Sequence, residues 1–181
     1  MILSSTDNVI KRGEALGFDV GGTVKGYASD PARTNRDCQS SKVMADFFDW
    51  TMQLRRKADI CFERDKSPAE LIDVVENESA ARRMQTSGVG RAGHGVGFET
   101  TEYSSLAALE GILFRPGMDF ACNLNFSKQF GFIIAENNWV VTETGAESLS
   151  GLMADLQMRT IRNTIHRPES DSAGPFHSEE V

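Results

Sequence analysis

Hydrophobic and polar positions near the N-terminus predict a β-hairpin. A short apolar run from Ala15 to Val20 is interrupted by Gly21 and Gly22, and a second run follows at 24–28. Short apolar runs on either side of glycines are typical of antiparallel strands joined by a tight turn. We therefore expect two short strands around a Gly-Gly turn.

Two helices are expected in the middle of the chain. Between Ser41 and about Glu63, apolar residues recur near the helical period. The second helix is predicted to begin at Ser67, where a capping box combines with Pro68 at the first helical position. Gly88 marks the expected end of this helix, because glycine readily adopts the conformation that follows a helix C-terminus.

Glycines become frequent in the second half, and the pattern there changes to that of strands. Strands are predicted at Met118–Asn125, Phe130–Ala135 and Asn138–Thr142. A last helix is predicted from Ala146 to about Ile165, and the polar residues 166–181 are expected to form a disordered tail. This order of elements predicts one α+β domain over residues 1–165.

Composition and charge narrow the range of partners. The chain has 181 residues and a net charge of −7, which argues against nucleic acid or an anionic membrane as a partner, since both select a basic surface. Cys38, Cys61 and Cys122 lack the CxxC spacing of metal and redox motifs and are interpreted as free thiols of a reducing compartment. With no signal peptide or membrane-spanning run in the sequence, we expect a cytoplasmic protein.

One histidine stands out as a candidate for chemistry. His94 lies between Gly93 and Gly95, and glycines on both sides let the backbone turn sharply and leave the imidazole unobstructed. A histidine in a glycine-rich turn can equally serve a structural role. Both interpretations stay open on this residue alone.

Three carboxylates join this histidine in a possible site. Asp19 and Asp30 would face one pocket if they lay on paired strands, although both also suit turns. Glu136 ends an apolar run, where a carboxylate either needs a partner or is solvated at the strand end. Together with His94, these oxygen-rich ligands suit Mn, Fe, Co or Zn.

The order and context of these residues resemble one family, the pita-bread metallohydrolases. The matching segments are Gly-Phe-Asp-Val-Gly at 17–21, Gly-Tyr-Ala-Ser-Asp-Pro-Ala-Arg-Thr at 26–34, Gly-His-Gly-Val-Gly at 93–97, Arg-Pro-Gly-Met at 115–118 and Ala-Glu-Asn-Asn-Trp-Val-Val-Thr-Glu-Thr-Gly at 135–145. The family includes aminopeptidase P, prolidase, methionine aminopeptidase and creatinase. The resemblance implies the pita-bread fold, which is an α+β fold.

The resemblance also implies a two-metal site. Asp19 would hold one metal, Asp30 and Glu136 would bridge two, and His94 would hold the second. At the place of a further family glutamate this chain has Asn123, a degraded ligand position. Three carboxylates then face two divalent ions, so we expect the second ion to bind more weakly.

Two further departures from the family bear on activity. Thr101 and Glu102 occupy the place of a family His-Glu pair, so a hydrogen-bond donor to the reaction intermediate would be missing. Either Glu136 or Glu102 is the expected proton shuttle. We also expect the domain to lack its opening strand-and-helix segment.

Two hypotheses about function follow. The first is a metal-dependent hydrolase, with Mn²⁺ favoured, that cleaves a peptide or another small amide as Xaa-Pro aminopeptidases and dipeptidases do; creatinase-like or lyase chemistry is the variant of this hypothesis. The second is a degenerate, metal-poor binding or dimerising protein. An open sheet edge near Asp19 predicts a homodimer. Asp19, Asp30, His94 and Glu136 are expected to converge within about 5 Å of one point.

Overall fold

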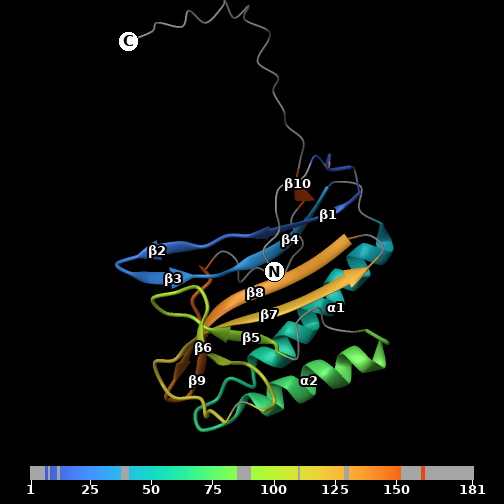
Figure 1. The fold of residues 1–181 in the computed structure, drawn as a ribbon. Coiled ribbons are helices and arrows are strands. Elements are labelled where there is room, and N and C mark those ends of the chain that lie inside the picture. Colours follow the sequence, from blue (N-terminus) through green and yellow to red (C-terminus); the bar gives the residue numbers. More distant parts are fainter. Residues whose placement is uncertain are drawn as a thin grey trace, which may run out of the picture.

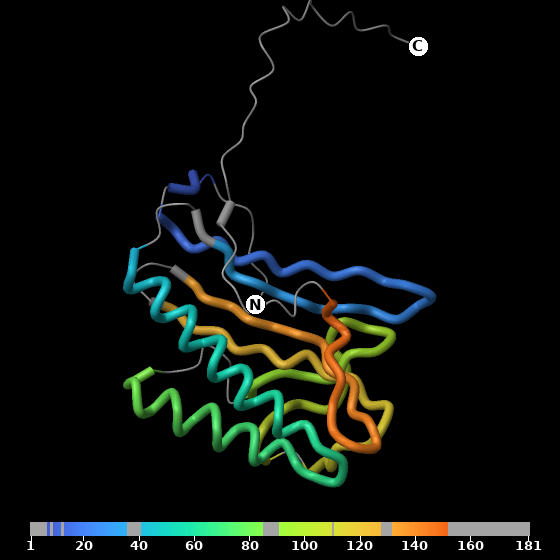
Figure 2. The backbone as a smooth tube through the Cα atoms, turned by 180° about the vertical axis from the view of Figure 1, so that it is seen from behind, coloured from blue at the N-terminus to red at the C-terminus, as the bar shows by residue number. Residues whose placement is uncertain are grey.

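The computed structural model describes residues 7, 9–11, 13–37, 41–84, 91–109, 111–128, 131–151 and 160–161. In chain order the elements are β1 (Ala15–Asp19), β2 (Gly22–Val24), β3 (Tyr27–Ser29), β4 (Ala32–Asp37), α1 (Lys42–Asp59), α2 (Pro68–Ala81), β5 (Gly93–Gly95), β6 (Glu102–Ser105), β7 (Asp119–Lys128), β8 (Gly131–Thr142), β9 (Gly145–Ser148) and β10 (Thr160–Ile161). In the described ranges, eight strands form one sheet in the order β1-β4-β8-β7-β5-β6, with β9 beside β8 and β10 beside β4 (Figure 1). Both helices lie in front of this sheet in Figure 2, so they cover one of its faces. The expected α+β arrangement is confirmed.

The hairpin near the N-terminus turns at a different place from the one expected. β2 and β3 form a two-stranded antiparallel ribbon, and its turn falls on Lys25 and Gly26, whose φ angles are 53° and 90°. Positive φ at both central residues is the geometry of a type I′ turn. The predicted turn at Gly21-Gly22 is therefore wrong. Gly21 instead allows close strand approach, because a Cβ there would lie 2.8 Å from the Ser29 carbonyl oxygen.

The long central hairpin of β7 and β8 is more continuous than predicted. The two strands pair without interruption from the row of Asp119 and Val140 to the row of Lys128 and Gly131. Two separate strands, Phe130–Ala135 and Asn138–Thr142, were expected, with Glu136 and Asn137 as a polar pair between them. This polar pair stays inside the strand, and both residues are buried.

The predicted helix from Ala146 is wrong at its start. A turn at Gly145, with φ 154°, returns the chain as β9, which pairs antiparallel with β8. Residues 152–159 and 162–181, including the predicted tail, lie outside the described residues. Thr160 and Ile161 form β10, which pairs in parallel with β4.

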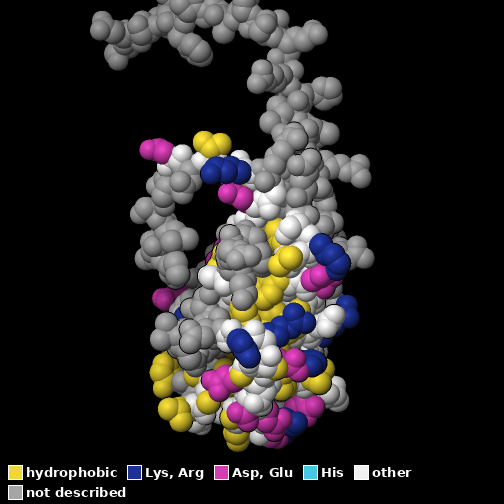
Figure 3. All heavy atoms as spheres, turned by 90° about the vertical axis from the view of Figure 1, so that its right-hand side faces the viewer, with side chains coloured by type: hydrophobic (Ala, Val, Ile, Leu, Met, Phe, Trp, Pro, Cys, Tyr) yellow, Lys and Arg dark blue, Asp and Glu magenta, His cyan; other side chains and the backbone are white. Residues whose placement is uncertain are grey.

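Both helices begin where the sequence predicts. The Ser41 hydroxyl accepts a hydrogen bond from the Met44 backbone N–H, and the Ser67 hydroxyl accepts one from the Ala69 N–H. These bonds satisfy N–H groups that have no partner inside the helix. Helix α2 ends at Ala81, ahead of the expected end. In the lower part of Figure 3, acidic and basic side chains lie side by side on the surface. An ion pair between Lys57 and Glu78 joins the two helices.

The core lies between the helices and one face of the sheet. Phe126 of β7 packs against Phe47 and Trp50 of α1, with ring centroids 6.0 and 5.0 Å apart. Since strand side chains alternate between faces, the same face carries the buried residues Phe120, Cys122 and Leu124. The residues between them, at 119, 121, 123 and 125, therefore face away from the helices. This alternation decides which side of the sheet can hold a site.

A buried polar cluster lies on the helix side of the sheet. Arg33 donates through Nη1 to the Glu136 carbonyl oxygen at 2.9 Å and through Nη2 to Asn137 Oδ1. Nearby in α1, Arg55 Nη1 lies 3.6 Å from Asp59 Oδ2. Burial raises the pKa of Asp59 to about 6, although the charges of Arg55 and Arg33 oppose this. Arg33 thus binds the backbone of β8 from the helix side of the sheet.

The raised pKa of Asp59 makes stability depend on pH. A folded-state pKa above the ordinary value means that folding favours the protonated form. The contribution is therefore present below about pH 4 and is lost as the pH rises through about 6. We expect the unfolding free energy of wild type to fall by about 2 kcal/mol more than that of Asp59→Asn between pH 4.5 and 7.5. Urea denaturation at several pH values measures the slope. Parallel slopes would contradict the assignment.

Candidate metal site

A row of residues runs across four strands on the face away from the helices. Asp19 of β1 is paired with Ala32 of β4, Ala32 with Glu136 of β8, and Glu136 with Asn123 of β7. Side chains directly opposite each other in paired strands lie on the same face. The sheet register therefore places three of the five predicted ligand positions in one line.

Three of the predicted ligands meet. Asp30, His94 and Glu136 each offer one ligand atom, and these atoms all lie within 4.8 Å of one another. His94 Nε2 is 3.5 Å from Asp30 Oδ2 and 3.7 Å from Glu136 Oε1. These separations are too long for ordinary hydrogen bonds. Two atoms bound at about 2.1 Å to one tetrahedral ion would lie about 3.4 Å apart, so the spacing fits a shared cation.

Local backbone geometry orients the imidazole. His94 Nδ1 is 3.2 Å from the Gly95 carbonyl oxygen, which favours the tautomer with the proton on Nδ1 and leaves the Nε2 lone pair toward the carboxylates. Gly93 has φ 155°, and a Cβ there would lie only 2.0 Å from the Ala121 carbonyl oxygen. The glycine is thus required for β5 to approach β7 closely enough to present His94.

Glu136 is the most deeply buried carboxylate of the group, with 1% of its side chain exposed. Burial, together with the negative charges of Asp30 and Asp19, raises its pKa to about 8. Burial and the charge of Asp19 also raise the pKa of Asp30. Glu136 Oε1 is buried and has no hydrogen-bond partner among the described residues. A buried, unpartnered carboxylate oxygen amid like charges is costly, and a divalent cation would offset both defects.

Asn123 takes a different role from the ligand position expected of it. Its Nδ2 donates to Glu136 Oε2 at 2.7 Å, and its Oδ1 accepts from Asn125 Nδ2 at 2.7 Å. The amide oxygen therefore accepts one hydrogen bond within β7, and the amide nitrogen is bound to Glu136. Asn123 holds one oxygen of Glu136 and leaves the other, Oε1, facing His94.

Asp19 and Glu102 lie outside the triad. Asp19 is exposed and is not part of the group within 4.8 Å, although its charge acts on Asp30 and Glu136. Glu102 Oε1 accepts hydrogen bonds from the backbone N–H groups of Phe98 and Glu99. Glu102 thus stabilises the loop after β5, and its role as a proton shuttle stays a prediction.

The sequence did not single out two residues beside the triad. Asn138 Oδ1 accepts a hydrogen bond from the Asp30 backbone N–H at 3.0 Å and so fixes the chain at that ligand. Burial raises the pKa of Asp119 to about 6, while the nearby polar groups of the Asn138 side chain and the Phe120 backbone oppose this shift. The available signal was an asparagine pair inside an apolar strand.

The chain is similar in sequence to curated dipeptidases. The chain is 28% identical over 168 residues to an Xaa-Pro dipeptidase of Lactobacillus helveticus, which covers 89% of this chain and 44% of that protein. It is 29% identical over 157 residues to a probable dipeptidase PepE of Mycobacterium tuberculosis, covering 83% and 41%. The chain thus spans less than half the length of these curated relatives. No described helix is long and apolar enough to cross a membrane.

Solved structures show the same fold. The prolidase of Thermococcus sibiricus matches with a TM-score of 0.80 at 17% identity, over 88% of this chain and 43% of that one. The N-terminal domain of the FACT complex subunit SPT16 from Eremothecium gossypii matches with a TM-score of 0.73 at 15% identity, over 86% and 37%. Both likenesses concern the pita-bread fold alone. The sequence model of metallopeptidase family M24 matches residues 2–143, more than half of the chain, and the chain therefore belongs to metallopeptidase family M24.

Proposed function

We propose that this chain carries the metal-binding core of a peptidase that cleaves Xaa-Pro dipeptides or related small amides. The observation that carries the proposal is the unpartnered, buried Oε1 of Glu136 facing His94 Nε2 and Asp30 Oδ2. Similarity to Xaa-Pro dipeptidases supports the substrate class.

Each residue of the site has a proposed role in metal binding or proton transfer. Asp30, His94 and Glu136 would hold the cation, and Asp19 would add charge from the exposed side. A divalent ion in such a site polarises a carbonyl group and lowers the pKa of water. Glu136 is also the proposed proton acceptor, because its buried carboxylate faces His94 Nε2 at the centre of the triad. Glu102 is less suited, since two backbone N–H groups already bind its carboxylate.

The donor set favours certain metals. Two carboxylates with one imidazole suit Mn²⁺, Co²⁺, Zn²⁺ or Fe²⁺, and we propose Mn²⁺ as the first to test. A homodimer is also proposed. It is supported by β1, which is an edge strand of the described sheet and pairs with β4 on one side. The side chain of Phe18 on this strand is exposed. The cytoplasmic location remains a prediction.

Metal content of Asn123→Glu tests the proposal. Wild type should retain about one Mn²⁺ per chain after dialysis, because the neutral amide of Asn123 adds no negative charge for a second ion. Asn123→Glu places a fourth carboxylate opposite Glu136 and should retain about two. Asn35→Glu is the matched control, since it adds the same charge to β4 with its side chain on the other face, and it should behave as wild type. Elemental analysis gives the metal content, and release of proline from Ala-Pro measures activity.

Each result separates the two functions. One equivalent in wild type together with hydrolysis of Ala-Pro supports the peptidase. Two equivalents in wild type would show that Asn123 does not limit the site. Absence of metal from all three proteins would reject the metal centre and favour a binding protein. Two observations favour that second function. One is the shared fold with the SPT16 domain, which is named as part of a complex, and the other is the donor role of Asn123.

A further inference from the structure

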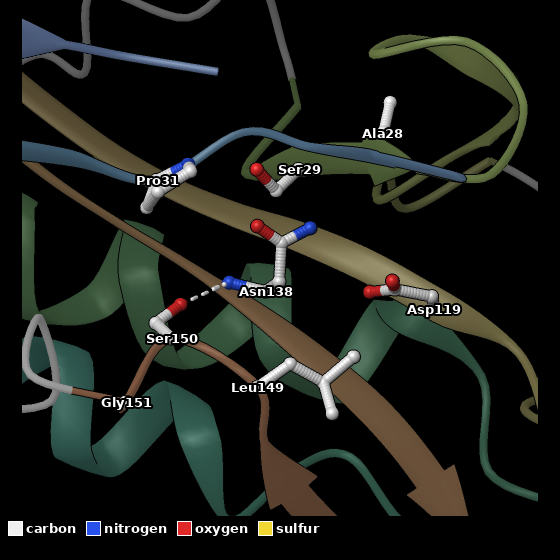
Figure 4. Close-up of a pocket in the computed structure, with 8 residues that line it drawn as sticks. All are labelled: Ala28, Ser29, Pro31, Asp119, Asn138, Leu149, Ser150 and Gly151. Atoms are coloured by element: carbon white, nitrogen blue, oxygen red, sulfur yellow. Dashed lines mark hydrogen bonds between the residues drawn. The ribbon is translucent and has the colours of Figure 1, made fainter. Parts of the chain in front are cut away.

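A pocket opens beside the triad where two strands separate. Pairing of β4 with β8 stops at the row of Ala32 and Glu136, and beyond it β8 is flanked by the segment that follows β9. There the Asn138 N–H donates to Ser150 Oγ, and the Leu149 N–H donates to the Asn138 carbonyl oxygen. The resulting cavity has a volume of about 260 Å³. It is lined by Ala28, Ser29, Pro31, Asp119, Asn138, Leu149, Ser150 and Gly151 (Figure 4).

Residues that line the pocket are neighbours of the candidate metal ligands in the chain and in the sheet. Ser29 and Pro31 lie on either side of the ligand Asp30 in the chain, and Asn138 holds the Asp30 backbone N–H. Asn138 also lies two residues beyond Glu136 on the same face of β8. A molecule bound at the triad would therefore have the pocket as its next space along the sheet.

The pocket contains one carboxylate among small and uncharged neighbours. Figure 4 shows the Asn138 side chain between Ser29 and Asp119. Asp119 Oδ1 and the neighbouring Asn138 Nδ2 are both buried without a hydrogen-bond partner among the described residues. The other lining side chains carry no charge. An unsatisfied carboxylate oxygen in such a space calls for a donor, and a cationic donor gives the strongest hydrogen bond.

Strand geometry sets how far that donor must reach. His94 is paired with Ala121, which lies two residues from Asp119 on β7, so the separation along the strand is about 7 Å. The α-amino group of a dipeptide substrate, which lies next to the scissile carbonyl, cannot reach across this distance to Asp119. The four-carbon stem of lysine, about 6 Å from Cα to Nζ, or the longer arginine side chain, reaches it.

We propose that this pocket is a subsite for a lysine or arginine side chain on the residue that precedes the scissile bond, an assignment that rests on the proposed peptidase function. Ala28 and Pro31 would contact the aliphatic stem, and Asp119 would pair with the cationic end. The Asn138 amide would keep the carboxylate in place.

Binding of two dipeptides that differ in charge tests the subsite without requiring catalysis. Lys-Pro and norleucyl-proline, which has an uncharged linear side chain, are titrated into the metal-free full chain at pH 8 and followed by NMR at the Asn138 and Gly151 amides. Wild type should bind Lys-Pro about fivefold to tenfold more tightly. Asp119→Asn, which keeps the shape of the side chain, should bind both equally. Asp73→Asn, an exposed carboxylate of α2, is the matched control and should keep the preference.

Hydrolysis of the same dipeptides with Mn²⁺ separates this inference from the function on which it rests. A charge preference that Asp119→Asn removes supports the subsite whether or not either dipeptide is cleaved. Cleavage of both without a preference overturns the subsite and leaves the peptidase intact. Equal binding of both dipeptides by wild type, or a preference that survives in Asp119→Asn, also overturns it.

Discussion

A Gly93→Ala variant is expected to lose at least about 3 kcal/mol of unfolding free energy, or not to fold at all. The added Cβ would lie 2.0 Å from the Ala121 carbonyl oxygen and 2.8 Å from Leu106 Cδ1, at a φ of 155° that L side chains rarely adopt. Because the closest atom belongs to the backbone of β7, no side-chain movement relieves the clash. Strand β5 would have to separate from β7, and His94 would move with it.

Urea denaturation of wild type, Gly93→Ala and Gly111→Ala measures this effect. An added Cβ at Gly111 meets nothing within 4 Å, so this control should stay within about 0.5 kcal/mol of wild type. If Gly93→Ala were as stable as the control, the close approach of β5 to β7 would be incorrect. The placement of His94 opposite Asp30 and Glu136 would then also be incorrect.

The second large effect is expected from Glu136→Gln, which should raise stability without metal and remove metal binding. Its folded-state pKa of about 8 lies above the ordinary value of 4.5. The contribution of Glu136 is therefore present below about pH 4.5 and is lost as the pH rises through 8. By pH 9 the loss reaches up to about 4 kcal/mol in wild type, and the uncharged glutamine avoids it.

Thermal unfolding at pH 9, with chelator and with Mn²⁺, separates the two effects. With chelator the variant should melt above wild type, and Mn²⁺ should raise the melting temperature of wild type alone. Glu76→Gln, on the exposed side of α2, serves as the control for loss of a carboxylate. A variant that gains as much from Mn²⁺ as wild type does would show that Glu136 is not a ligand.

Local signals in the sequence predicted the parts of the fold that depend on near neighbours. Ser41 and Ser67 cap their helices because serine offers a hydroxyl to a nearby N–H, and this interaction is complete within a few residues. The type I′ turn at Lys25 was missed because its geometry follows from the twist of the paired strands. The short β9 was mistaken for the start of a helix, since only pairing with β8 decides its conformation.

The candidate site divides in the same way. Asp30, His94 and Glu136 were named from their sequence context, and the structure brings them together. Register across the sheet was needed to see that Asn123 donates to Glu136 and accepts from Asn125. The role of Arg33, which binds the β8 backbone from the helix side, depends on two strands that are far apart in the chain.

The strand order has a consequence for how the protein is made. Asp30 precedes β4, whereas Glu136 lies in β8, and the two strands pair only after nearly the whole domain has been synthesised. Contacts of such long sequence separation form late in folding. On the ribosome, Asp30 and His94 would emerge well before their third partner. We therefore expect the complete triad to form only after β8 has left the ribosome and paired with β4.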